Sequence, residues 1–266
     1  MAAVYGVELR KLLGQGRVRA TAAVCLLGPL LFAIVLSAQQ ALPRDAPFGR
    51  YAHDSGAAVS LVVLGFAGQW LLPVLTGVVA GEIVSGERDT GTWDLIATRG
   101  VGPTRVVLGK AAAAATWSVL LVALLAVSAT VGGLVTAGSH ELVTLSGATV
   151  GSGSAVEVVA ESWLSAVLPA LGWAAVGLLA SSLSSRAGVG VLAVVVTGAT
   201  VQLSTLVPTV PLLQRVLLSE PTAAWHGLAS SPAYDGPLLL GIAVTAAWVA
   251  VCVAGAVAVT LGRGRA

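Results

Sequence analysis

The sequence predicts an all-α membrane protein with six transmembrane helices, an N-terminal interfacial helix and a cytosolic helix between spans two and three. Hydrophobic residues make up 56% of the 266 residues and charged residues only 10%, whereas a soluble domain carries about 25% charge. The apolar residues also form charge-free runs close to the roughly 20 residues that cross a bilayer. Within one domain, 1–266, we expect spans at 20–38, 57–80, 111–135, 163–182, 187–207 and 237–261.

Residues 3–16, before the first span, predict a helix that lies along the membrane surface. Apolar residues recur at the spacing of one helical face, and the charged residues among them turn elsewhere. Basic residues beside an apolar stripe suit the headgroup boundary. A short cytosolic tail with chance periodicity is the alternative. The stripe consists of Tyr5, Leu9, Leu12 and Leu13.

The second span and two connections carry further signals. Gln69 lies near the middle of the second span, where a polar amide avoids lipid, so it either bonds to another helix, the favoured interpretation, or faces a transported molecule. Residues 136–162 are rich in Gly and Ser and predict a polar loop. The apolar run 212–218 is too short to cross.

Basic residues orient the spans, because cytoplasmic loops carry an excess of Lys and Arg. A cytoplasmic N-terminus places eleven of the 14 basic residues on the cytoplasmic side and leaves Arg44, Arg50 and Arg215 on the other. Both termini are therefore predicted in the cytoplasm, together with the segment between spans two and three.

That segment, 81–104, is the most densely charged part of the chain. Ser85 is expected to cap a short helix that starts at Gly86, with acidic residues in its first turn complementing the helix dipole. Gly91 is expected to end the helix. An apolar and hydroxyl-bearing surface follows at Thr92, Trp93, Leu95 and Ile96. An ordinary solvated loop is the alternative.

The sequence supports no enzyme site, metal site or nucleic-acid interface. No ionisable residue lies near the centre of a span, where a charge costs about 2.5–3.5 kcal/mol. Adjacent His53, Asp54 and Ser55 cannot form a catalytic relay. Lys110 follows Gly109 without the other residues of a phosphate-binding loop, and the basic residues form no compact patch. If ATP drives this protein, another polypeptide must bind it.

The order of residues between spans two and three resembles the signature of ABC-2 type permease subunits, the six-span membrane halves of ATP-driven exporters. The N-terminal helix and the six-span layout extend the resemblance over nearly the whole chain. The loop at 136–162 is longer and richer in Gly and Ser than the family pattern. The resemblance rests on Glu8 to Lys11, Glu82, Glu87, Gly91, Thr92, Leu95 to Thr98, Pro103, Arg105, Gly109 and Lys110.

The resemblance implies that segment 81–104 is a coupling helix that docks onto a separate ABC ATP-binding subunit, which would bind ATP and Mg. A second permease subunit, identical or different, and membrane lipid are the other partners implied. It also implies outward transport, of a drug, lipid or peptide. The few lysines relative to arginines indicate a bacterial protein, for which we expect the cytoplasmic membrane. The residues assigned to the ATPase contact are Glu82, Glu87, Arg88, Asp89, Gly91 and Thr92.

Polar or aromatic side chains of spans two and five are expected to line the transport path. Two other functions stay open. An ion-coupled carrier or channel would need a titratable group inside the bundle, and a non-transporting membrane assembly factor would need no ATPase. The predicted path residues are Gln69, Trp70, Gln202, Ser204 and Thr205.

Overall fold

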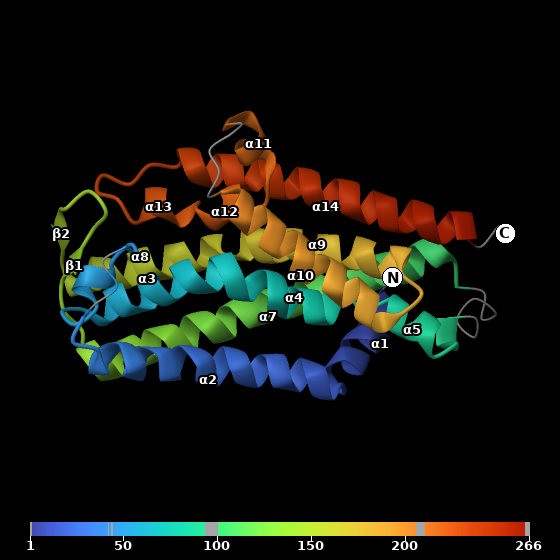
Figure 1. Cartoon of the computed structure of the whole chain (residues 1–266), viewed down its shortest axis with the longest axis horizontal. Coiled ribbons are helices and arrows are strands. Elements are labelled where there is room, and N and C mark those ends of the chain that lie inside the picture. Colours follow the sequence, from blue (N-terminus) through green and yellow to red (C-terminus); the bar gives the residue numbers. More distant parts are fainter. Residues whose placement is uncertain (1, 42, 44, 94–100, 206–210, 264–266) are drawn as a thin grey trace.

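The computed structural model describes residues 2–41, 43, 45–93, 101–205 and 211–263, and nearly all of these are helical (Figure 1). Six helical stretches of the described chain are long and apolar enough to cross a membrane. This number and the helical architecture confirm the predicted all-α fold with six transmembrane helices. The stretches are Gly16–Ala38, Gly56–Asp89, Pro103–Ala137, Ser152–Leu183, Ala187–Ser204 and Gly236–Arg263.

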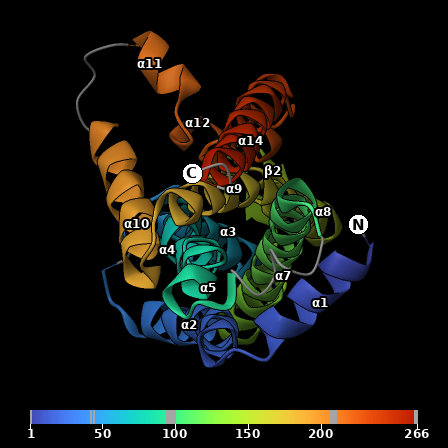
Figure 2. The same ribbon diagram turned by 90° about the vertical axis from the view of Figure 1, so that its right-hand side faces the viewer.

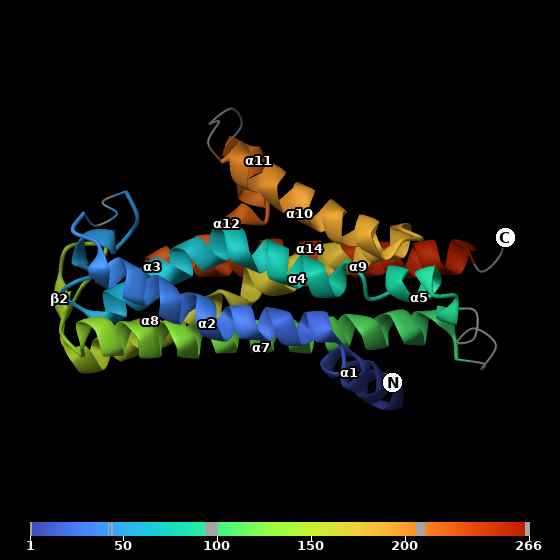
Figure 3. The same cartoon turned by 60° about the horizontal axis from the view of Figure 1, so that its bottom comes forward.

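The N-terminal helix α1 (Ala2–Leu13) precedes α2 (Gly16–Ala38), which forms the first crossing. Figures 2 and 3 show α1 crossing the beginning of α7, outside the main bundle. Leu12 is buried, whereas Val7 and Leu13 are exposed. One side of α1 is thus held by protein and another carries free apolar surface; its contact with lipid stays a prediction.

A short 3₁₀ helix, η1 (Gly49–Tyr51), leads to the second crossing, which is not a regular helix. It consists of α3 (Gly56–Phe66), the π-helical turn η2 (Ala67–Leu71) and α4 (Leu72–Ala80). Pro73 explains the turn because it has no N–H for the carbonyl four residues earlier. The N–H of Leu72 bonds instead to the carbonyl of Ala67, five residues earlier. Such turns occur frequently at functional sites.

The third crossing, α7 (Pro103–Ala137), has 35 residues and is about 52 Å long at 1.5 Å per residue. It therefore extends well beyond the roughly 30 Å of a hydrocarbon core. A small antiparallel hairpin follows, formed by β1 (Leu142–Val143) and β2 (Thr149–Val150). This end of the bundle is called the hairpin end below.

The polar loop predicted at 136–162 is shorter in the structure, because α8 (Ser152–Ser165) begins before Trp163. α9 (Val167–Leu183) continues the same crossing. The acidic pair Glu157 and Glu161 is exposed, one helical turn apart, while Val159 between them is buried. These charges belong to the outer face of an amphipathic helix and not to a loop.

The last part of the chain crosses the bundle in α10 (Ala187–Ser204) and α14 (Gly236–Arg263), which three short helices connect. α10 leans away from the other crossings (Figure 3), and only 17% of its apolar window is buried, against 67% for Gly56–Asp89. After it come the short helices, which cannot cross a bilayer, and then α14, the sixth crossing. Their bounds are α11 (Pro211–Val216), α12 (Ser219–Thr222), α13 (Trp225–Leu228) and α14 (Gly236–Arg263).

Small residues allow the second, fourth and fifth crossings to approach closely, as in many membrane bundles. A Cβ atom on Gly190 of α10 would lie 2.0 Å from the carbonyl oxygen of Gly81, and a Cβ on Gly177 of α9 would lie 2.7 Å from the Cβ of Ala80. These contacts fix α9 and α10 around the end of α4.

The helix α5 (Ser85–Asp89), α1 and the end of α14 lie together at the end of the bundle opposite the hairpin (Figure 1). We call this the α5 end. An even number of crossings places α1 and the end of α14 on one side, in agreement with the predicted topology. That this side is the cytoplasm stays a prediction.

Candidate functional site

The helix α5 is anchored by α9. The Oγ of Ser181 in α9 accepts hydrogen bonds from the N–H groups of Val84 and Ser85, each at 2.9 Å. The hydroxyl of Ser85 donates to the carbonyl of Gly81 at 3.1 Å. The prediction that Ser85 caps the helix is therefore wrong, because the helix begins at Ser85 itself and a serine distant in sequence satisfies its first N–H groups.

The last residue of α5, Asp89, and the three residues after it are exposed, and we call residues 89–92 the α5 tip. Gly91 has a φ of +69°, a conformation that glycine adopts without strain, and it lies after the end of the helix as predicted. The hydroxyls of Thr90 and Thr92 lie 2.8 Å apart, and Thr92 also donates to the carbonyl of Glu87 at 3.1 Å. These bonds order the tip. The predicted surface residues Leu95 and Ile96 lie outside the described residues.

Arg88 turns away from the tip toward the end of α9. Its Nη1 donates to the carbonyls of Ser182 and, at 3.3 Å, Ser184, and its guanidinium lies 5.2 Å from the centre of the Trp93 ring. Arg263 of α14 donates to the same end of α9, to the carbonyl of Leu183 at 2.7 Å. Two cations thus satisfy carbonyls at a helix C-terminus, where positive charge is favourable.

The two glutamates predicted to contact an ATPase are paired within the chain. Glu87 is 6% exposed, and its Oε1 lies 2.7 Å from the Nζ of Lys110 and also pairs with Lys11. Glu82, which is half-buried, pairs with Arg17 of α2. The Oε1 of Glu87 is thus occupied by the two lysines, whereas its buried Oε2 accepts no hydrogen bond within the described residues. Of the predicted contact residues, Asp89, Gly91 and Thr92 are exposed.

A cleft of about 630 Å³ opens beside the α5 tip, between α1, the beginning of α2 and α5. Charged and polar groups surround it, so a side chain from a soluble partner could enter it and find hydrogen-bonding groups. Polar residues that line it are Glu8, Lys11, Gln15, Arg17, Glu82, Glu87, Asp89, Thr90 and Thr92.

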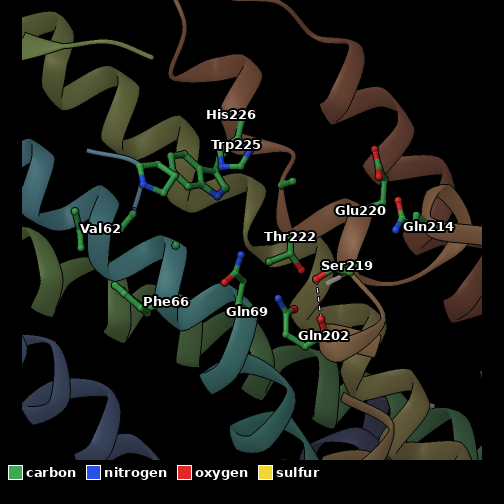
Figure 4. Close-up of a pocket in the computed structure, with 15 residues that line it drawn as sticks. Val62, Phe66, Gln69, Gln202, Gln214, Ser219, Glu220, Thr222, Trp225 and His226 are labelled. Atoms are coloured by element: carbon green, nitrogen blue, oxygen red, sulfur yellow. Dashed lines mark hydrogen bonds between the residues drawn. The ribbon is translucent and has the colours of Figure 1, made fainter. Parts of the chain in front are cut away.

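A second cavity, of about 320 Å³, lies where η2 faces the end of α10 and the short helices α12 and α13. Figure 4 shows the amides of Gln69 and Gln202 turned toward the same space. Thr205 also lines this cavity, whereas Ser204 and Trp70 do not. Ser204 donates to the carbonyl of Val201 at 2.6 Å, and Trp70 is 48% exposed. The structure therefore brings together three of the five predicted path residues.

Sequence analysis missed the other walls of this cavity. Phe66 and Trp225 supply apolar surface, and Gln214, Glu220 and His226 add polar groups. The rings of Trp225 and His226 are 4.3 Å apart between centroids, and burial lowers the pKa of His226. Phe66 lies at the end of α3, and the others follow α10 in short helices with no periodicity that would have marked them.

Comparison with known families matches residues 8–201 to a family model described as ABC-2 family transporter protein. No curated protein was found to match the chain. The matched range begins within α1 and ends within α10. It includes the ion-paired residues of the α5 end, the α5 tip and Gln69, and it stops before Gln202.

Proposed function

The chain belongs to the ABC-2 transporter family, and we propose that it is the permease subunit of an exporter in a bacterial cytoplasmic membrane. In this proposal a separate ATP-binding subunit, which holds ATP and Mg, supplies the energy. The permease pairs with a second permease, identical or different, and moves a hydrophobic or amphipathic compound outward.

The ATPase subunit docks on the α5 tip and the adjoining cleft. Asp89 and Thr92 are exposed there and present a carboxylate and a hydroxyl. Glu82, Glu87 and Arg88 support the tip from behind through their contacts with α1, α2, α7 and α9. A pull on the tip is then transferred to packed helices, and rigid bodies tilt to open the path on the other side.

The exposure of a polar cluster on apolar helices is the observation that carries the transport proposal. Gln69 and Thr205 are exposed, Gln202 is half-buried, and all three line one cavity. Amide groups do not favour contact with lipid. This face of η2 and α10 therefore lines the path or meets the second permease, and the small buried fraction of α10 supports the same assignment.

Co-purification tests the coupling half of the proposal. The tagged permease is expressed with a candidate ABC ATP-binding protein from the same genome, and we expect the two to elute together. Asp89→Lys at the tip should abolish the complex. Asp54→Lys is the matched control, because Asp54 is equally exposed but lies at the hairpin end. Retention of the complex by Asp89→Lys would refute docking at the tip.

Transport assays in proteoliposomes test the path. Gln69→Leu and Gln202→Leu should each lower ATP-driven export at least fivefold, whereas Thr200→Val should not, because Thr200 lies on α10 outside the cavity and bonds to the carbonyl of Val196. Transport that needs no ATPase and stops with an ionophore would support a secondary carrier instead. Absence of both transport and an ATPase partner would support an assembly factor.

A further inference from the structure

A buried charge network joins three segments at the α5 end. Lys110 of α7 is 0% exposed. Its Nζ lies 2.8 Å from the Oε2 of Glu8 in α1 and 2.7 Å from the Oε1 of Glu87 in α5. Lys11 of α1 pairs with the same oxygen of Glu87. Lys110, Glu8 and Glu87 are buried, whereas the side chain of Lys11 is 42% exposed. Together the two lysines and two glutamates balance in charge, which lowers the cost of burying three of them.

The same face of α1 is fitted to α7 by packing. A Cβ atom on Gly109 would lie 2.6 Å from the Cγ1 of Val4, so a larger residue there would have to displace Val4. The hydroxyl of Tyr5 lies 3.1 Å from the Oγ1 of Thr116. Glu8 and its partner Lys110 continue the contact along the helix. α1 is therefore docked on the protein along this face, whatever its other side meets.

We propose that Lys110 is a positioning residue that locks α1, α5 and the first turns of α7 into one body. This inference rests on the proposed function, because the motion it transmits comes from the ATPase subunit. When the α5 tip is pulled, Glu87 carries Lys110 with it, and Lys110 carries Glu8 and thus α1. The N-terminal helix then moves together with the third crossing.

The geometry favours transmission over mere anchorage. Glu87 lies two residues before the exposed Asp89, so the network begins directly behind the tip. Its ion pairs join residues 76 and 102 positions apart in sequence. Since burial leaves no water to replace a lost partner, the charges separate only at a large cost. The three segments therefore shift together more readily than past one another.

The test compares export per ATP hydrolysed in proteoliposomes that contain the permease and the ATPase subunit. Lys110→Met should lower this ratio at least tenfold while the ATPase subunit still binds, and Lys110→Arg should stay within threefold of the wild type. Arg10→Met is the control, because Arg10 lies on α1 but is exposed. A ratio for Lys110→Met equal to that of Arg10→Met would overturn the proposal.

The double variant Glu8→Gln/Lys110→Met guards against misfolding. It restores charge balance, since the Lys11–Glu87 pair remains. However, α7 no longer forms an ion pair with α1 or α5. The proposal expects this protein to fold and still to be uncoupled. Recovery of wild-type export per ATP by the double variant would show that only charge balance matters and would refute positioning by Lys110.

Hydrogen exchange separates failure of this inference from failure of the proposed function. Without any ATPase, Lys110→Met should speed amide exchange across α1 at least tenfold relative to Arg10→Met. With the ATPase trapped by a non-hydrolysable nucleotide, exchange in α1 should change together with that in α5 in the wild type only. If no ATPase binds the wild type, the proposed function fails, and the first measurement still decides whether Lys110 holds α1 in place.

Discussion

Replacement of Gly190 by alanine should destabilise the protein and pull α10 away from the end of the second crossing. The new Cβ would lie 2.0 Å from the carbonyl oxygen of Gly81 and 3.2 Å from the Cα of Ser181. Both obstacles are backbone atoms, which cannot rotate aside as the end of a flexible side chain can. The helices must therefore separate by about 1.5 Å to reach a normal contact distance of about 3.5 Å.

The cost follows from over-packing, which typically amounts to about 1–3 kcal/mol and sometimes more. We place Gly190→Ala near the upper end, at about 3 kcal/mol, because neither helix can yield locally. Soluble domains of comparable length lose roughly 2–4 °C in Tm for each kcal/mol, so a decrease of roughly 6–12 °C is expected.

Thermal unfolding in detergent, followed by the fluorescence of the seven tryptophans, measures this decrease. Gly188→Ala is the matched control, because Gly188 lies on the same helix and a Cβ there would meet no atom within 4 Å. It should change stability by no more than about 0.5 kcal/mol. Equal melting temperatures for the two variants would refute the close approach of α10 to Gly81.

Three further predictions use the same measurement or export assays. Ser181→Ala leaves the buried N–H groups of Val84 and Ser85 without their acceptor and should cost about 1–3 kcal/mol, whereas Ser182→Ala, which only frees a carbonyl of its own helix, should cost less. Burial lowers the pKa of His226 below 6.5, so the folded protein favours the neutral imidazole. The contribution of this neutral imidazole to folding stability is complete above pH 6.5 and is lost as the pH falls through the lowered pKa. His226→Gln should therefore show a smaller decrease in Tm between about pH 7 and pH 5 than the wild type. Pro73→Ala restores an N–H for a regular helix and should lower export by turning Gln69 from the cavity; unchanged export would contradict that role.

The six crossings could be predicted because each is a charge-free run of sufficient length. α8 could not be predicted, because the exposed Glu157 and Glu161 on one face of the helix make its sequence resemble that of a polar loop. The π-helical turn also escaped prediction, because Pro73 removes an N–H but its presence alone does not indicate whether the helix bends or changes its hydrogen-bond spacing. Local patterns indicate where a helix lies but not how it adapts to a proline.

The α5 end was predicted as a charged and exposed segment, and the α5 tip fits that description. Glu87 does not, because its two lysine partners come from helices far away in sequence and close upon it only after folding. Lys110 itself offered a sign, since it precedes an uninterrupted apolar run and a lysine there needs a partner. Gln69 and Gln202 could be predicted to line one cavity, because each is a polar residue in an apolar helix.

The π-helical turn in the second crossing has a consequence for how relatives diverge. A turn of this kind accommodates one residue more than an α-helical turn between the same two ends, so deletion of a single codon between Ala67 and Leu71 would restore an ordinary helix without shortening the crossing. Because the two flanking halves keep their positions, such a deletion would change only the side chains of the turn itself, Gln69 among them, that face the cavity. A family could change what its members recognise by this one genetic step.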